Sequence, residues 1–251
     1  MTLFQFFVLA SAGLSAGVLN AVAGGGTFLT FPALVWFGLP PVAANATSTL
    51  AAMPGYIGSA WAFRHDLRAE GALGLRPILL CAALGSLIGA GLLIVTPGNV
   101  FSGAVPWLLL VATLLFATGP ALLRLLRRSG RADAGPLVSA LVLLIVSAYG
   151  GYFNGGLGII LLAAFGLLGY TDIHGMNGLK CLLSAVISIL SAVAFALSGL
   201  IAWMPALVIA VAITIGGVIG AQQSRKIKRT GLIRAFVTLV GLAMTVAFFL
   251  A

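Results

Sequence analysis

Long apolar stretches separated by short polar connections dominate this chain of 251 residues. Five stretches precede an arginine-rich segment at residues 124–136, and five follow it. An α-helix of about 20 apolar residues crosses the hydrocarbon core of a bilayer. The pattern therefore predicts an all-α integral membrane protein. The stretches of the first half are Phe4–Val22, Phe28–Leu39, Val42–Phe63, Leu73–Val95 and Phe101–Leu123; those of the second half are Leu137–Phe153, Ile159–Leu168, Ile173–Leu197, Ala202–Gln222 and Leu232–Ala251.

The second stretch of each half is too short to cross a bilayer, and each follows a glycine-rich break. We expect a half-helix or re-entrant segment that begins near the middle of the membrane after each break. The backbone N–H groups at such a helix start attract an anion. The alternative is that the glycines only allow helices to pack closely. The breaks read Gly17-Val-Leu-Asn20-Ala-Val-Ala-Gly24-Gly25-Gly26-Thr27 and Gly151-Tyr-Phe-Asn154-Gly155-Gly156-Leu-Gly158.

Other features recur in the same order in both halves. Asn45 opens the third stretch of the first half, and Asn177 lies near the start of its counterpart. A tandem duplication explains this correspondence. We therefore expect one transmembrane domain over residues 1–251, which consists of repeat one at 1–123, a cytoplasmic link at 124–136 and repeat two at 137–251.

The basic residues predict how these repeats are oriented. Of the 13 lysines and arginines, all except Lys180 fall at residues 64–76, 124–131 and 225–234. By the positive-inside rule these three connections are cytoplasmic and both termini lie outside. The basic connection follows the third stretch of the first half but the fourth stretch of the second half. The two repeats of five therefore have opposite orientations, which is typical of secondary transporters.

The overall composition excludes several classes of protein. The chain is 61% hydrophobic and only 7% charged, which no soluble domain of this size matches. Its net charge of +9 is confined mainly to loops, so we expect no nucleic-acid partner. Its two cysteines lie in apolar stretches and predict neither a disulfide framework nor a metal site. We expect no cofactor and no enzyme activity, because the apolar stretches hold only isolated polar groups.

The candidate chemistry lies in the few polar residues within apolar sequence. Lys180 is the only basic residue outside the loops, and an ammonium inside a membrane normally faces a cavity or a partner. It could balance a bound anion, snorkel to the interface or form a salt bridge with Asp172. The asparagines could donate to an oxyanion or hydrogen-bond between helices. The predicted substrate-binding residues are Asn20, Gly24, Gly25, Gly26, Thr27, Asn45, Ser48, Asn154, Gly155, Gly156, Asn177 and Lys180.

The first glycine-rich break, followed by Pro32 and by Asn-Ala-Thr-Ser at residues 45–48, resembles the sulfite exporter TauE/SafE family. The resemblance covers nearly the whole chain. The second half departs from the first, because it has no proline that matches Pro32 and carries Lys180 where the first half has Ser48.

The resemblance implies a secondary transporter that moves sulfite or small organosulfur anions across the bacterial inner membrane by alternating access. Sulfonates such as sulfoacetate are candidate substrates, and thiosulfate is a further one. The implied partners are a small anion and the lipid bilayer, with a homodimer as a candidate assembly. A passive anion channel of the same architecture is the alternative.

Overall fold

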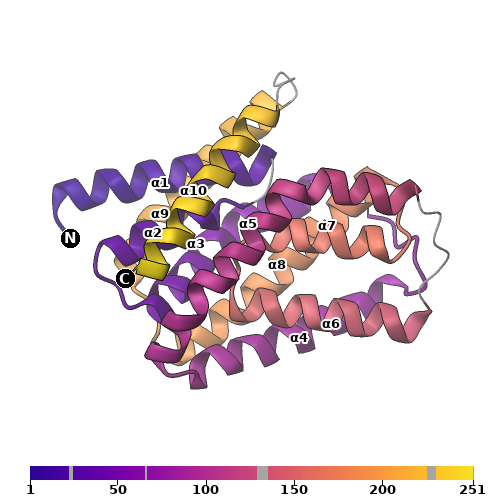
Figure 1. Cartoon of the computed structure of the whole chain (residues 1–251), viewed down its shortest axis with the longest axis horizontal. Helices are drawn as coiled ribbons and strands as arrows, with labels where there is room; N and C mark the ends of the chain where they lie inside the picture. Colours follow the sequence, from indigo (N-terminus) through magenta and orange to yellow (C-terminus); the bar gives the residue numbers. More distant parts are fainter. Residues whose placement is uncertain (23–24, 66, 129–134, 225–229, 251) are drawn as a thin grey trace.

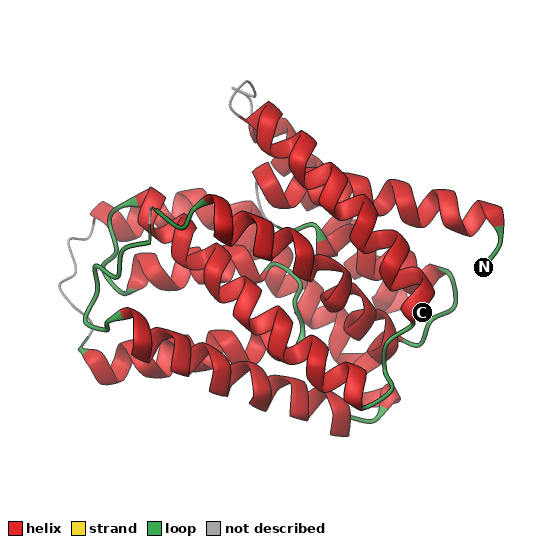
Figure 2. Cartoon of the chain, turned by 180° about the vertical axis from the view of Figure 1, so that it is seen from behind, coloured by secondary structure: helices red, strands yellow, loops and turns green. Residues whose placement is uncertain are grey.

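A computed structural model describes residues 1–22, 25–65, 67–128, 135–224 and 230–250. This part of the chain contains ten α-helices and no strand, which confirms the predicted fold class (Figures 1 and 2). The helices are α1 (Leu3–Val22), α2 (Thr27–Trp36), α3 (Pro41–Ala62), α4 (Leu75–Val95), α5 (Gly98–Arg128), α6 (Pro136–Tyr152), α7 (Leu157–Leu167), α8 (Ile173–Leu197), α9 (Trp203–Ser224) and α10 (Thr230–Leu250).

The helices follow the apolar stretches closely, with one difference. Helices α2 and α7 are short, at 10 and 11 residues, and each follows a glycine-rich break as predicted. Helix α5 continues to Arg128, so the first part of the expected link at 124–136 is helical. Leucine and arginine are both good helix formers, so the helix extends beyond the end of the apolar stretch.

Helix pairing in the bundle follows a regular scheme. Helix α1 packs along α9, and α4 packs along α6, while α3 packs against α8 and α5 against α10. Exchanging α1–α5 with α6–α10 in order turns the α1–α9 pair into the α4–α6 pair and leaves the α3–α8 and α5–α10 pairs unchanged. The chain termini lie at one end of the bundle, and the turn between α3 and α4 lies at the other (Figure 1).

Helices α3 and α8 run antiparallel through the interior. At one end, the Glu70 carboxylate after α3 accepts hydrogen bonds from the backbone N–H groups of Thr171 and Asp172 before α8, at 3.4 and 3.2 Å. At the other end, the Ala202 N–H after α8 donates to Thr47 Oγ1 near the start of α3, at 3.0 Å. The start of each helix therefore lies beside the end of the other.

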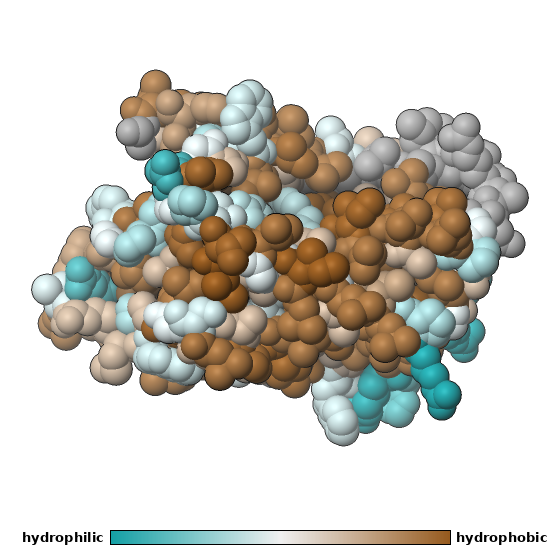
Figure 3. Space-filling view, turned by 90° about the horizontal axis from the view of Figure 1, so that it is seen from below, coloured by the Kyte–Doolittle hydropathy of each residue, from teal (hydrophilic) through white to brown (hydrophobic). Residues whose placement is uncertain are grey.

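The outward face of the bundle is apolar. Large hydrophobic side chains such as Leu80, Ile145 and Val211 are exposed, and hydrophobic groups cover much of the surface in Figure 3. Contiguous exposed apolar surface on this scale is unfavourable in water and fits a lipid environment. Five helices in the described part of the chain are long and apolar enough to cross a membrane. The protein is accordingly a multi-pass membrane protein.

Glycines allow two helix pairs to approach backbone to backbone. A Cβ at Gly17 of α1 would overlap the Ile213 carbonyl of α9, and one at Gly89 of α4 would overlap the Ala148 carbonyl of α6. Small residues at helix interfaces permit such contact in membranes, where dispersion contacts replace the hydrophobic effect as the driving force.

This packing predicts a position-specific effect of enlarging glycines on α4. A Gly89→Leu substitution would overpack the α4–α6 contact, and overpacking of a close contact costs roughly 1–3 kcal/mol. We expect the melting temperature of the detergent-purified protein to fall by roughly 3–10 °C. Gly91→Leu on the same helix is the control, because a Cβ there has no neighbour within 4 Å. Equal melting temperatures for the two variants would contradict the packing assignment.

Candidate functional site

Both glycine-rich breaks turn the chain through a backbone conformation that favours glycine. Gly25 has φ of 100° and Gly156 has φ of 72°, in the left-handed region where other residues are strained. Helix α2 begins at Thr27 and helix α7 at Leu157, directly after these turns. The glycines therefore act as the sharp corners from which the two short helices start. Gly24, a predicted site residue, lies outside the described residues.

The starts of the two short helices meet in the interior of the bundle. Thr27 Oγ1, at the first residue of α2, donates to the backbone carbonyl of Asn154 at 3.3 Å. A Cβ on Gly156 would lie 3.5 Å from the ring of Phe28, the second residue of α2. Residues 25–27 and 154–157 are buried, so this contact joins two helix N-termini from distant parts of the sequence inside the bundle.

Side chains from several helices satisfy the backbone of the breaks. Asn20 Oδ1 accepts from the Gly26 N–H at 2.7 Å, so this asparagine caps the start of α2. Asn45 Nδ2 of α3 donates to the Tyr152 carbonyl at 2.9 Å, just before the second break. These hydrogen bonds fit the requirement that backbone polar groups inside a membrane find partners within the protein.

The second break lacks the cap that the first break has. The Tyr149 hydroxyl donates to the Gly155 carbonyl at 2.7 Å, so this backbone acceptor of the break is satisfied. No side chain in the described part of the chain accepts from the N–H groups of Gly155 or Gly156, and the Leu157 N–H donates to the Asn154 carbonyl at 3.4 Å. The backbone donors at the start of α7 are therefore not capped by the protein's own side chains.

Two asparagines of the breaks keep a buried polar atom without a partner. Asn154 Nδ2 donates to Ser188 Oγ of α8 at 3.0 Å, which leaves Asn154 Oδ1 unpaired within the described structure. Asn20 Nδ2 is likewise unpaired there. Buried polar atoms are usually paired, so these two mark places where a guest molecule or water would gain a hydrogen bond.

Lys180 of α8 lies against the first turn of α7. A Cβ on Gly158 would be 3.4 Å from Lys180 Cδ, so the missing side chain of that glycine makes room for the lysine stem. The lysine ammonium donates to Asn177 Oδ1 at 3.1 Å, one turn earlier on α8. An ammonium has three hydrogen atoms to donate, and this is the one hydrogen bond it makes within the described residues.

Asp172 does not pair with Lys180. Its carboxylate oxygens accept from the N–H groups of His174 and Gly175, at 3.0 and 3.1 Å, and so cap the start of α8. These two backbone hydrogen bonds lower the pKa of Asp172 below its ordinary value. The alternative of a salt bridge between Lys180 and Asp172 is thus absent from the described structure.

The structure brings most of the predicted residues into two neighbouring groups. One group is the meeting point of the breaks, with Ser48 of α3 close by, since its hydroxyl shares a 2.6 Å hydrogen bond with Thr30 of α2. The other group is Asn177 and Lys180, beside the start of α7. The members of the first group are Asn20, Gly25, Gly26, Thr27, Asn45, Asn154, Gly155 and Gly156. Binding of a substrate by these residues stays a prediction.

Three residues of this region were not among the predicted site residues. Gly158 stood in the second glycine motif, but its contact with Lys180 depends on how α7 packs on α8. Tyr149 and Ser188 reach the break from α6 and α8. The apolar pattern gave no signal for Tyr149, which reads as an ordinary aromatic residue of a membrane helix.

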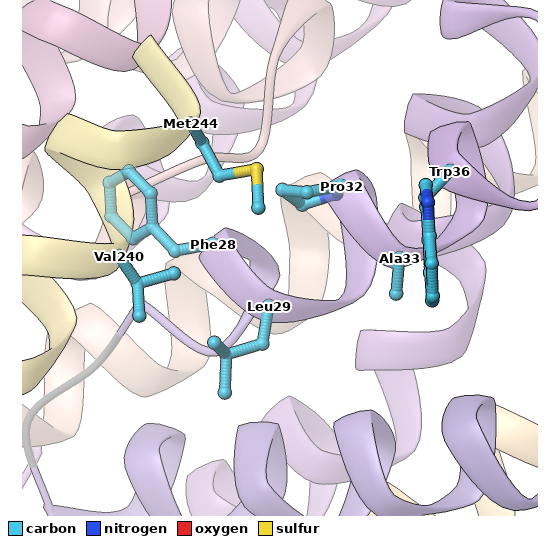
Figure 4. Close-up of a pocket in the computed structure, with 7 residues that line it drawn as sticks. All are labelled: Phe28, Leu29, Pro32, Ala33, Trp36, Val240 and Met244. Carbon is cyan, nitrogen blue, oxygen red and sulfur yellow. The ribbon is translucent and has the colours of Figure 1, made fainter. Parts of the chain in front are cut away.

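An apolar groove of about 210 Å³ lies between α2 and α10 (Figure 4). Its lining has no charged side chain, and the Trp36 indole N–H is its one side-chain donor, so it offers an anion no counter-charge. It therefore lies outside the candidate site. Its lining residues are Phe28, Leu29, Pro32, Ala33, Trp36, Val240 and Met244.

A multi-pass helical protein with two broken helices that meet in its interior has the architecture of a membrane transporter. The chain belongs to the sulfite exporter TauE/SafE family, whose model matches residues 9–248. This match confirms the resemblance seen in the sequence.

Relatives of known sequence agree with this assignment. The chain is 30% identical to a probable membrane transporter protein of Haemophilus influenzae, over 95% of this chain and 92% of the relative. It is 28% identical to the probable membrane transporter protein YfcA of Escherichia coli, over 95% of this chain and 87% of the relative. A probable membrane transporter protein, ORF9, of a Sinorhizobium species is 31% identical over 67% of this chain and 62% of the relative. No solved structure matches the chain.

The cap at the start of α2 yields a testable prediction. Asn20→Ala removes the acceptor for the Gly26 N–H, and loss of such a cap costs roughly 0.5–2 kcal/mol. We expect the melting temperature to fall by roughly 2–6 °C. Gln5→Ala is the control, because Gln5 Oε1 also accepts from a backbone N–H but does so at the exposed chain start. A Gln5→Ala effect as large as that of Asn20→Ala would contradict the capping role.

Proposed function

We propose that the protein is a secondary transporter that moves sulfite or small organosulfur anions by alternating access. The observation that carries this proposal is the meeting of the two helix starts, where Thr27 Oγ1 contacts the Asn154 carbonyl and Lys180 lies against the first turn of α7. Transporters with discontinuous helices bind substrates at such breaks near the middle of the membrane.

The charges around the site favour an anion over a cation. Helix N-termini carry partial positive charge, and the Lys180 ammonium adds a full one. The four acidic residues of the chain, Asp66, Glu70, Asp133 and Asp172, all lie outside the bounds of the ten helices. A cation would therefore meet no carboxylate inside the bundle, whereas an oxyanion would meet hydrogen-bond donors and a counter-charge.

The pairing of the helices supports two inverted repeats, at residues 1–123 and 137–251 with a cytoplasmic link at 124–136. Helices α3 and α8 are counterparts in the two halves and run antiparallel. Hydrogen bonds between loops and helices of opposite halves close both ends of this pair. In alternating access, one set of end contacts would open while the other stays closed.

We further propose that the protein lies in the bacterial inner membrane with both termini in the periplasm. The basic residues at 64–76, 124–131 and 225–234 would then be cytoplasmic, in line with the positive-inside rule. A homodimer is a candidate assembly, and the chain itself contains both halves of the site.

Transport and its dependence on Lys180 test this function. In proteoliposomes, wild-type protein should show saturable uptake and counterflow of radiolabelled sulfite, thiosulfate or sulfoacetate. Lys180→Met keeps the apolar stem but removes the charge-assisted hydrogen bond, which is worth about 1.5–3 kcal/mol. The dissociation constant for the same anion should therefore rise by roughly 10–150-fold.

The controls separate the remaining alternatives. Lys180→Arg should restore only part of the affinity, because the guanidinium is planar and has a different reach. Equal affinities for wild type and Lys180→Met would remove the lysine from the site. Flux that neither saturates nor shows counterflow would indicate a passive anion channel, and no flux of any of the three anions would overturn the proposed substrate class.

Thiol labelling tests the proposed orientation. Gly98 and Gly74 are both exposed, and a Cβ at either position has no neighbour within 4 Å. A cysteine in place of Gly98 should react with an impermeant thiol reagent added outside intact spheroplasts, whereas one in place of Gly74 should react only after the membrane is opened. The reverse pattern would invert the topology.

A further inference from the structure

Helix α8 carries a row of polar residues that extends well beyond Lys180. Asn177, Lys180, Ser184, Ser188 and Ser191 follow one another at spacings of three or four, which places them on one face of the helix. At 1.5 Å per residue this row is roughly 21 Å long, a large part of a bilayer core of about 30 Å. The three serines are at most 1% exposed.

Several polar atoms in this row are unpaired. The hydroxyls of Ser184 and Ser191 make no hydrogen bond within the described structure, and Asn154 Oδ1, beside Ser188, makes none either. Serine and threonine in helices often donate to the carbonyl four residues earlier, as Ser198 and Thr214 do here. Other unpaired buried atoms, on Asn20, Thr113 and Ser147, occur singly on different helices. Half of the unpaired buried side-chain atoms of the described structure are therefore on α8 or on the residue bonded to it.

The matching face of α3 is different. If Asn45 is aligned with Asn177, then Ser48 corresponds to Lys180 and Ser59 to Ser191. Asn45 donates to the Tyr152 carbonyl, Ser48 bonds to Thr30, and Ser59 donates to the Gly55 carbonyl at 2.8 Å. These polar groups of α3 are thus engaged in holding the structure, whereas the hydroxyls of Ser184 and Ser191 on α8 are unpaired and available to a guest.

We propose that this face of α8 is the track along which the transported oxyanion crosses the protein, a proposal that rests on the proposed function. Lys180 receives the anion at the start of α7, and the hydroxyls of Ser184 and Ser191 donate hydrogen bonds to its oxygens farther along the helix. Ser188, with Asn154 bonded to it, lies between Ser184 and Ser191 on this face. A half-turn of the Asn154 amide keeps the bond to Ser188, since a hydroxyl both donates and accepts, and presents Nδ2 as a further donor.

The chemistry of this track selects small oxyanions. Neutral hydroxyl and amide donors stabilise an anion in transit without the tight binding that a row of full charges would cause. The track is closed in this structure, because its serines are buried. An anion therefore gains access only when α8 separates from a neighbouring helix, as alternating access requires.

Two alanine variants test the track. Ser184→Ala and Ser191→Ala each remove one donor to a charged substrate, so counterflow should slow by roughly tenfold per substitution, the rate equivalent of about 1.4 kcal/mol. The melting temperature should stay equal or rise, because each change also removes an unpaired buried hydroxyl. Slower transport together with unchanged or higher stability is a signature that a merely structural serine would not produce.

Ser59→Ala is the matched control, because Ser59 is the counterpart of Ser191 on α3 and its hydroxyl is already bonded. It should transport at the wild-type rate. The measured substrate is whichever of sulfite, thiosulfate and sulfoacetate gives counterflow with wild-type protein. If wild type transports and both α8 variants match it, or if they lose activity only with a lower melting temperature, the track is wrong and the transporter assignment stands. If wild type moves none of the three anions, the proposed function itself fails.

Discussion

The fold depends on one constraint, which is that a broken helix inside a membrane must find hydrogen-bond partners for its backbone within the protein. The second break meets this constraint partly through donors from the other half. Asn45 and Thr27, both from the first half, donate to the carbonyls of Tyr152 and Asn154. Packing of the two halves therefore completes the hydrogen bonding of the second break. The close helix pairs α1–α9 and α4–α6 also join one half to the other.

The two halves share a scaffold but use it for different purposes. In the first half, Asn20 caps the start of α2, and Ser48 is bonded to Thr30. In the second half, no side chain within the described residues caps the start of α7, and Lys180 takes the position that corresponds to Ser48. Gly158 provides the space for the lysine stem. The first half thus uses its polar groups mainly for structure, and the second half keeps a charge and several donors available.

Much of this fold could be predicted from the sequence because apolar length and glycine position are local signals. These two signals predict where the helices lie, and they also predict that α2 and α7 are short. The end of α5 was missed because arginines end an apolar stretch without ending a helix. The contact between Thr27 and Asn154 depends on how distant segments approach one another, which no local pattern contains. That the Asn20 oxygen accepts from the Gly26 N–H, while its Nδ2 stays unpaired within the described structure, is likewise decided only by the folded backbone.

The electrostatics of the second half explain why an anion suits this site. The ammonium of Lys180 and the partial positive charge at the start of α7 have the same sign and lie close together. The Asn177 oxygen offsets only part of this charge, and no acidic residue falls within the bounds of the helices. Such an arrangement is unfavourable in a medium of low dielectric constant until a negative charge joins it. On the proposed function, the bound anion is therefore the missing counter-charge of the site, and it lowers the energetic cost of holding the Lys180 ammonium inside the membrane.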